Sequence, residues 1–88
     1  MDAGELQRLR TAAKATPDDA TVKLHLAEAL LAAGQHQAGL QHCLEIVSRE
    51  RGPLRDQARQ RMLDVFKVLG EESETTGDYR RQLARALY

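Results

Sequence analysis

Three histidines and one cysteine are the side chains of this chain that could bind a metal ion. Imidazole and thiolate groups bind zinc when three or four of them converge. His36 and Cys43 are seven residues apart, about 10 Å along a helix, which is too far for them to share one ion. His42 points about 100° away from that face, and His25 belongs to another segment. We expect both to be surface polar residues. We therefore expect no metal site and no cofactor.

Cys43 is also the only thiol, so neither an intramolecular disulfide nor a C-x-x-C redox pair can form within this chain. A reactive cysteine needs a nearby cation and partial exposure. The apolar stripe that contains Cys43 also holds Leu40, Leu44 and Val47. The pattern predicts a buried, inert thiol. An enzyme would need a pocket that joins His36 to acidic residues, and no spacing indicates one, so we expect a non-catalytic protein.

Apolar residues recur at helical spacing in five segments, and Gly or Pro residues lie in the breaks between them. The predicted helices cover about 3–15, 19–33, 37–49, 54–69 and 76–87. No segment alternates as a strand does. Only 3% of the residues are aromatic, which favours close-packed helices over β-sandwiches. The fold class is therefore all-α, with about five helices.

The ends of two helices carry specific signatures. Asp18 or Asp19 is predicted to cap the second helix, and Gly34 to end it in a left-handed turn. Thr75 and Asp78 are predicted to form a capping box at the start of the fifth helix. The second helix is apolar around most of its circumference, so it should lie between neighbours.

Length and charge exclude several classes of protein. Eighty-eight residues suffice for a single domain, residues 1–88. The formal net charge is zero, so neither nucleic acid nor an anionic membrane surface is expected as a partner. The longest apolar run, residues 29–33, is far shorter than the ~20 residues that span a bilayer. Asp2 and Glu5 interrupt any signal-peptide pattern, and the single cysteine suits a reducing, cytoplasmic location.

An internal repeat is visible when the chain is divided at its glycines. Gly34 and Gly70 each separate two predicted helices and are 36 residues apart, close to the ~34-residue tetratricopeptide repeat. The first unit resembles that repeat at Leu26-Ala27, Leu30, Gly34, Gly39 and Cys43, and the second at Met62, Phe66 and Gly70. The resemblance implies a right-handed stack of antiparallel helix hairpins that binds proteins. The second unit is irregular, because 71–77 is longer than the usual turn.

The C-terminal half has a narrower resemblance. Segments 58–66, 69–70 and 79–87 are similar to the C-terminal tetratricopeptide-like region of thioredoxin-like co-chaperones, the chaperedoxin family, and similarity extends over nearly the whole chain. No thioredoxin domain or redox-motif cysteine is present. The resemblance implies a C-terminal part of a longer thioredoxin-like protein, or a free-standing relative. It also implies a co-chaperone whose partner is a chaperonin or an unfolded client protein.

The repeat places a binding groove on the first helix of each unit. The positions that line it are Leu24, Glu28 and Leu31 in the first unit and Gln60, Asp64 and Lys67 in the second. The Lys-and-Asn clamp that grips acidic C-terminal peptides is missing. Leu24 and Leu31 would make the groove apolar, either for a partner helix or because the first predicted helix covers them.

The fifth predicted helix carries the other candidate contacts. Leu83 and Leu87 should pack inward, which leaves Arg80, Arg81, Arg85 and Tyr88 as candidate protein-binding residues. Nearby acidic residues could neutralise part of this positive charge. A structural role is the alternative: the domain would pack on its own upstream domain or form a homodimer.

Overall fold

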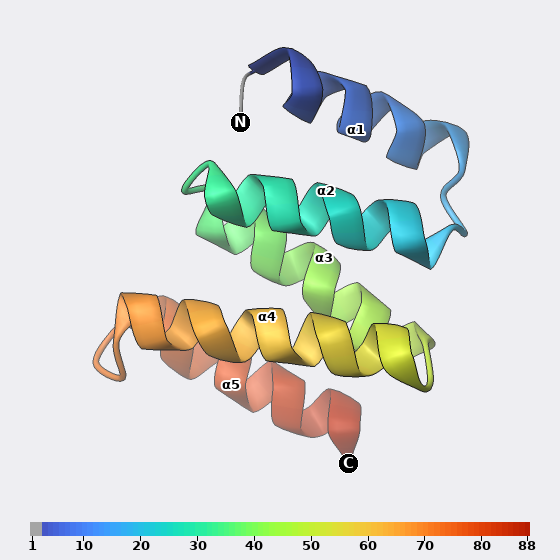
Figure 1. Ribbon diagram of the computed structural model, residues 1–88. Helices are drawn as coiled ribbons and strands as arrows, with labels where there is room; N and C mark the ends of the chain where they lie inside the picture. The colour runs from blue at the N-terminus through green and yellow to red at the C-terminus, as the bar shows by residue number, and fades with distance from the viewer. Residues whose placement is uncertain (1–2) are drawn as a thin grey trace.

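The computed structural model describes residues 3–88 as an all-α protein with five packed helices, as the sequence predicts. The helices are α1 (Ala3–Ala15), α2 (Ala20–Ala32), α3 (His36–Arg49), α4 (Pro53–Leu69) and α5 (Glu74–Leu87). Figure 1 shows α2 and α4 side by side in front of α3 and α5. No helix among residues 3–88 is both long enough and apolar enough to cross a membrane.

Two antiparallel helix hairpins, α2–α3 and α4–α5, form the stack (Figure 1). α3 is its central element, because it packs on α2, α4 and α5. α5 packs mainly on α3 and only lightly on α4, the other helix of its own hairpin. The long turn predicted over 71–77 is wrong, because α5 begins at Glu74 and only residues 70–73 connect it to α4, much as residues 33–35 connect α2 to α3. Among the five helices of residues 3–88, α2 is the only one on which α1 packs.

The buried side chains form two clusters that α2 separates. The main core is built by α2, α3, α4 and α5, and a smaller cluster lies between α1 and α2. Leu6 of α1 is buried there against α2, with Leu9 and Ala13 packed at its edge. The smaller cluster contains Leu6, Leu26, Ala29 and Leu30. α2 is thus covered on two sides, as its apolar circumference predicts.

Both ends of α2 have the signatures that the sequence predicts. Asp19 caps α2 by accepting hydrogen bonds from the backbone N–H groups of Thr21 and Val22 at 3.0 and 3.2 Å. Gly34, with a φ of +81°, ends α2 in the predicted turn, and its N–H donates to the carbonyl of Leu31.

The predicted capping box at Thr75 and Asp78 is wrong. α5 begins at Glu74, and Ser73 caps it, because its backbone is extended and its hydroxyl accepts from the N–H of Thr76 at 3.5 Å. Asp78 pairs instead with Arg81 on the surface of the helix. The cap therefore lies two residues before the one predicted.

A glycine sets the distance between α2 and α3. Gly39 is buried where the two helices cross, and a Cβ atom there would lie 2.5 Å from Cδ2 of Leu31 and 3.1 Å from the carbonyl oxygen of Ala27. A larger residue would push the helices or the Leu31 side chain apart. The small-residue position of the repeat is thus a true point of close approach.

Candidate functional site

The predicted groove positions on α2 do not share one environment. Leu24 is 3% exposed and belongs to the main core, so the expectation that it lines an open groove does not match its position. Leu31 is partly buried against the same core, and Glu28 is partly exposed. Coverage of Leu24 by α1 is also excluded, because α1 packs on the side of α2 that carries Leu26 and Leu30.

An ion-pair network joins α2 to α4. Nε of Arg61 lies 2.8 Å from Oε2 of Glu28, and Nη1 of Arg61 lies 3.5 Å from Oδ2 of Asp64. The hydrogen bond to Glu28 is the main reason that the pKa of Arg61 is raised. Gln60 donates to Oδ1 of Asp64 at 2.9 Å. Three of the predicted groove positions, Glu28, Gln60 and Asp64, therefore meet in one polar network.

Arg61 is the residue of this network that the sequence analysis missed. Its spacing of three from Asp64 on a helix is a local indication of an ion pair. Its contact with Glu28 spans 33 residues and depends on how α2 and α4 cross. Only the packing of the two hairpins therefore reveals its role.

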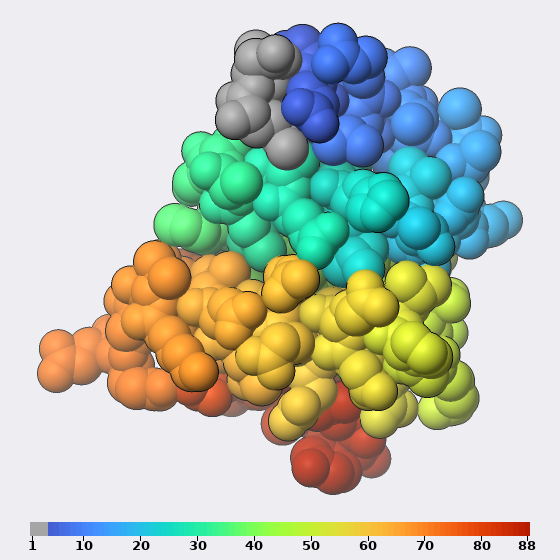
Figure 2. Space-filling model, viewed as in Figure 1, coloured from blue at the N-terminus to red at the C-terminus, as the bar shows by residue number. Residues whose placement is uncertain are grey.

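A hollow of about 310 Å³ lies beside this network, toward the C-terminal ends of α2 and α4. Its lining is mostly apolar, and His36, Arg61 and Asp64 are its polar side chains. Val68 is 76% exposed there, whereas Val65 is buried. The lining residues are Leu31, Ala32, His36, Arg61, Asp64, Val65 and Val68. We call this hollow, together with Glu28, the α2–α4 face; α2 and α4 meet on the side of the molecule seen in Figure 2.

The candidate contacts on α5 differ from one another. Arg80 pairs with Glu71, and its guanidinium carbon lies 5.0 Å from the centre of the Phe66 ring. Arg81 pairs with Asp78, so acidic neighbours neutralise both arginines, as predicted. Arg85 is exposed and has no ion pair with another residue of 3–88.

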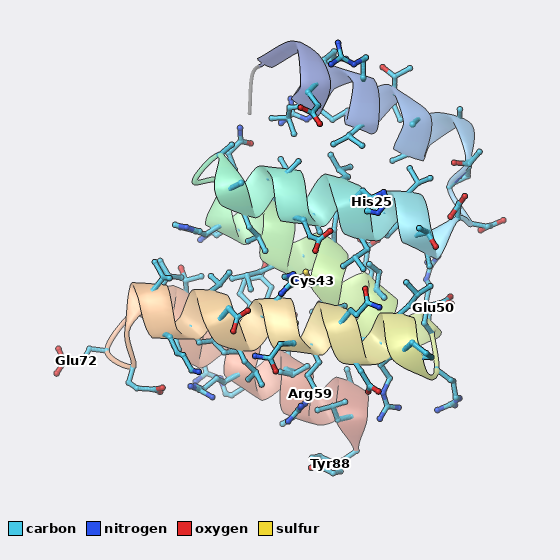
Figure 3. The ribbon with its side chains drawn as sticks, viewed as in Figure 1. His25, Cys43, Glu50, Arg59, Glu72 and Tyr88 are labelled. Atoms are coloured by element: carbon cyan, nitrogen blue, oxygen red, sulfur yellow. The ribbon has the colours of Figure 1, made fainter. Side chains whose placement is uncertain are left out.

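Tyr88 is fully exposed and extends from the C-terminal end of α5 (Figure 3).

α5 itself is firmly docked. Leu83 is 6% exposed and Thr76 is fully buried. The hydroxyl of Tyr79 donates to Oε1 of Gln41 at 3.2 Å and lies 3.4 Å from the carbonyl oxygen of Gln37, both on α3. Displacing α5 would therefore open the main core.

Cys43 is fully buried, as predicted, and lies between α2 and α4 in the view of Figure 3. Burial is the main reason that the pKa of its thiol is raised from 9.0 to about 12; the charge of Glu28 also raises it, and that of Arg61 lowers it. The thiol therefore stays protonated at neutral pH, and such a group is neither a nucleophile nor a metal ligand.

Two of the histidines were predicted to lie on the surface. His25 is exposed, but His42 is partly buried, and its Nδ1 atom has no hydrogen-bond partner among the residues described. The prediction is thus wrong for His42, whose Nδ1 atom is buried. Within residues 3–88, no three His, Cys, Asp or Glu side chains are placed to hold a metal ion.

Two antiparallel helix hairpins that share a core through α3 define a helical-repeat protein. The family model of the tetratricopeptide repeat matches residues 1–88, and the chain belongs to this family. No curated protein and no solved structure gives a significant match. The broader resemblance is therefore confirmed, whereas these comparisons give no support to the narrower one with thioredoxin-like co-chaperones. A tetratricopeptide domain is typically a non-catalytic module that binds other proteins.

Proposed function

We propose that this chain binds a segment of a partner protein at its α2–α4 face. The observation that carries the proposal is the apolar hollow of about 310 Å³ beside the Glu28–Arg61–Asp64 network. Most binding sites combine an apolar surface that a partner side chain fills with a few polar groups that fix its orientation. The α2–α4 face has both parts.

Val68 is the apolar group most available to a partner. It is one of two large apolar side chains that are strongly exposed among residues 3–88, and the other is Tyr88. Burying an aliphatic side chain against such a surface contributes about 1.5–3 kcal/mol. The half-exposed ion pairs beside it contribute orientation more than affinity, because solvent screens them.

An unfolded client is the partner that we favour. Such a polypeptide exposes single aliphatic and aromatic side chains, and a hollow of this size accepts one of them without a large complementary surface. Contact with a chaperonin rests on the resemblance to co-chaperones alone. A stable homodimer is less well supported, because isolated apolar residues bury far less than the ~1,200 Å² of a stable interface.

The test measures binding of a fluorescently labelled, permanently unfolded polypeptide by anisotropy. We expect Val68→Asp to weaken binding roughly fivefold or more, because it places a charge in the hollow. Tyr88→Asp is the matched control, since it removes the other exposed apolar side chain at the far end of α5. Circular dichroism checks that both variants fold.

Equal losses in the two variants, or no loss in either, would refute the α2–α4 face as the binding site. Loss with Tyr88→Asp alone would move the contact to the end of α5. Sedimentation of the unmodified protein gives a separate readout: a dimer that Val68→Asp dissociates would show that a second copy, and not a client, occupies this face.

A further inference from the structure

A second groove lies on another side of α2. α1 and α3 both pack on this helix, yet within residues 3–88 no Cα atom of α1 lies within 8 Å of a Cα atom of α3. Figure 1 shows α1 above α2 and α3 behind it. The space between them is an open groove of about 430 Å³. Ala13 of α1 and Ala38 of α3 are its accessible apolar side chains, and Leu26 and Leu30 of α2, only 4% and 2% exposed, close its floor.

The groove also has a charged rim. Nζ of Lys23 lies 3.0 Å from Oε2 of Glu45, so these two charges neutralise each other. Arg10 and Lys14, one helical turn apart on α1, are the remaining ionised groups. Arg10 donates to the amide oxygen of Gln35 at 3.2 Å, which leaves its charge uncompensated.

Neither Arg10 nor Lys14 pairs with a carboxylate among the residues that the structure describes. The rim therefore carries two unbalanced positive charges, although the net charge of the whole chain is zero. Complementary charge steers a partner to a surface and fixes its register. An occupant that matches this groove is thus both apolar and acidic.

We propose that the groove between α1 and α3 binds an amphipathic segment of a partner protein, with aliphatic side chains on one face and Asp or Glu residues beside them. A helix that lies in a groove presents aliphatic anchors one turn apart, with room for acidic residues beside them. The aliphatic side chains contact Ala13 and Ala38. The acidic residues face Arg10 and Lys14. This surface is distinct from the α2–α4 face.

The probe is a synthetic amphipathic peptide with Leu on one face and Glu on its flanks, titrated into ¹⁵N-labelled protein. The reference peptide replaces every Glu with Lys. We expect the acidic peptide to shift amide resonances of residues that line the groove and to bind roughly tenfold or more tightly than the basic one. Its affinity should fall with added salt, since the charges lie at an exposed rim.

Two variants test the roles of charge and shape separately. Arg10→Glu with Lys14→Glu should weaken binding of the acidic peptide roughly tenfold or more. The matched control is Arg55→Glu with Arg59→Glu, which changes the charge equally at the same spacing on α4, away from the groove. Ala38→Phe should block binding without any change of charge, because it fills the groove.

Several results would overturn the proposal. The first is that the two peptides bind equally, and the second is that the acidic peptide does not bind at millimolar concentration. The third is that the two double variants lose the same affinity, and the fourth is that amide resonance shifts are confined to the α2–α4 face. Concentration-dependent shifts at the groove in protein alone would identify a second copy as the occupant and also overturn it. Val68→Asp should leave peptide binding unchanged, so failure of this proposal is distinguishable from failure of the proposed function.

Discussion

Cys43 shows how one buried side chain is tied to the candidate site. It lies in the main core, yet its pKa responds to the charges of Glu28, which raises it, and Arg61, which lowers it. The ion pair between Glu28 and Arg61 on the α2–α4 face therefore lies close to the part of the core that holds Cys43. Burial remains the larger cause of the shift.

This shift predicts a loss of stability at alkaline pH. The thiol pKa is 9.0 in an unperturbed cysteine and about 12 in the folded protein. Above pH 9 the unfolded chain loses this proton while the folded protein keeps it, which favours unfolding. The stabilisation is complete below pH 9 and is lost as the pH rises toward 12, by up to about 1.4 kcal/mol per pH unit.

Urea unfolding at a series of pH values above and below 9 measures this effect. The free energy of unfolding of Cys43→Ala should fall less steeply with pH than that of the unmodified protein. Tyr79, whose pKa burial also raises, is present in both proteins and cancels in the comparison. Equal slopes would show that Cys43 does not carry the dependence.

At the scale of elements, the crossing of α2 and α3 depends on Gly39. Alanine normally stabilises a helix interior by about 1 kcal/mol relative to glycine. Here its Cβ atom would overlap the side chain of Leu31 and press on the carbonyl of Ala27. Steric overlap in a packed interior costs roughly 1–3 kcal/mol, so the clash should outweigh the gain in helix propensity.

We therefore expect Gly39→Ala to lower the free energy of unfolding by about 1–2 kcal/mol. Chemical denaturation measures this loss in the otherwise unmodified protein and in a Leu31→Ala background, where the closest overlap is absent. The cost should shrink by more than about 1 kcal/mol in that background, because residues in contact couple. An identical cost in both backgrounds would exclude Leu31 as the cause.

α5 illustrates what helix periodicity predicts and what it leaves open. Its apolar stripe correctly indicated that Leu83 packs inward. It did not indicate the position of the cap, which depends on the extended backbone of Ser73. Pairing of Arg80 with Glu71 and Arg81 with Asp78 agrees with the expected local neutralisation.

For the whole molecule, the division into two buried clusters predicts two levels of stability. α1 is held by the small cluster against α2 alone, whereas α3 contacts α2, α4 and α5. Opening α1 therefore exposes little buried surface and leaves the main core in place. Segments with few buried contacts open with lower free energy than the core.

Native-state hydrogen exchange tests this prediction. Amides of α1 should exchange roughly 100-fold or more faster than those of α3 between Leu40 and Val47. Leu6→Ala should accelerate exchange in α1 further while leaving α3 nearly unchanged, since Leu6 packs only in the small cluster. Equal opening free energies for α1 and α3 would mean that the five helices unfold as one unit.

Local features of the sequence determined where the helices lie and which faces are buried. Glycine and proline breaks separate the five helices, and apolar spacing placed Cys43, Leu83 and the circumference of α2 in the interior. These features need no knowledge of the partners, because helix periodicity and backbone restrictions act within a few residues. The family likeness follows from the same local pattern.

Only the tertiary structure decided how those faces meet. Leu24 is buried rather than groove-lining, Arg61 reaches Glu28, and α1 stays apart from α3. Each of these results depends on the angle and separation of helices that are distant in the chain. Crossing geometry is set by how many side chains fit together at once, and a single sequence pattern does not contain that information.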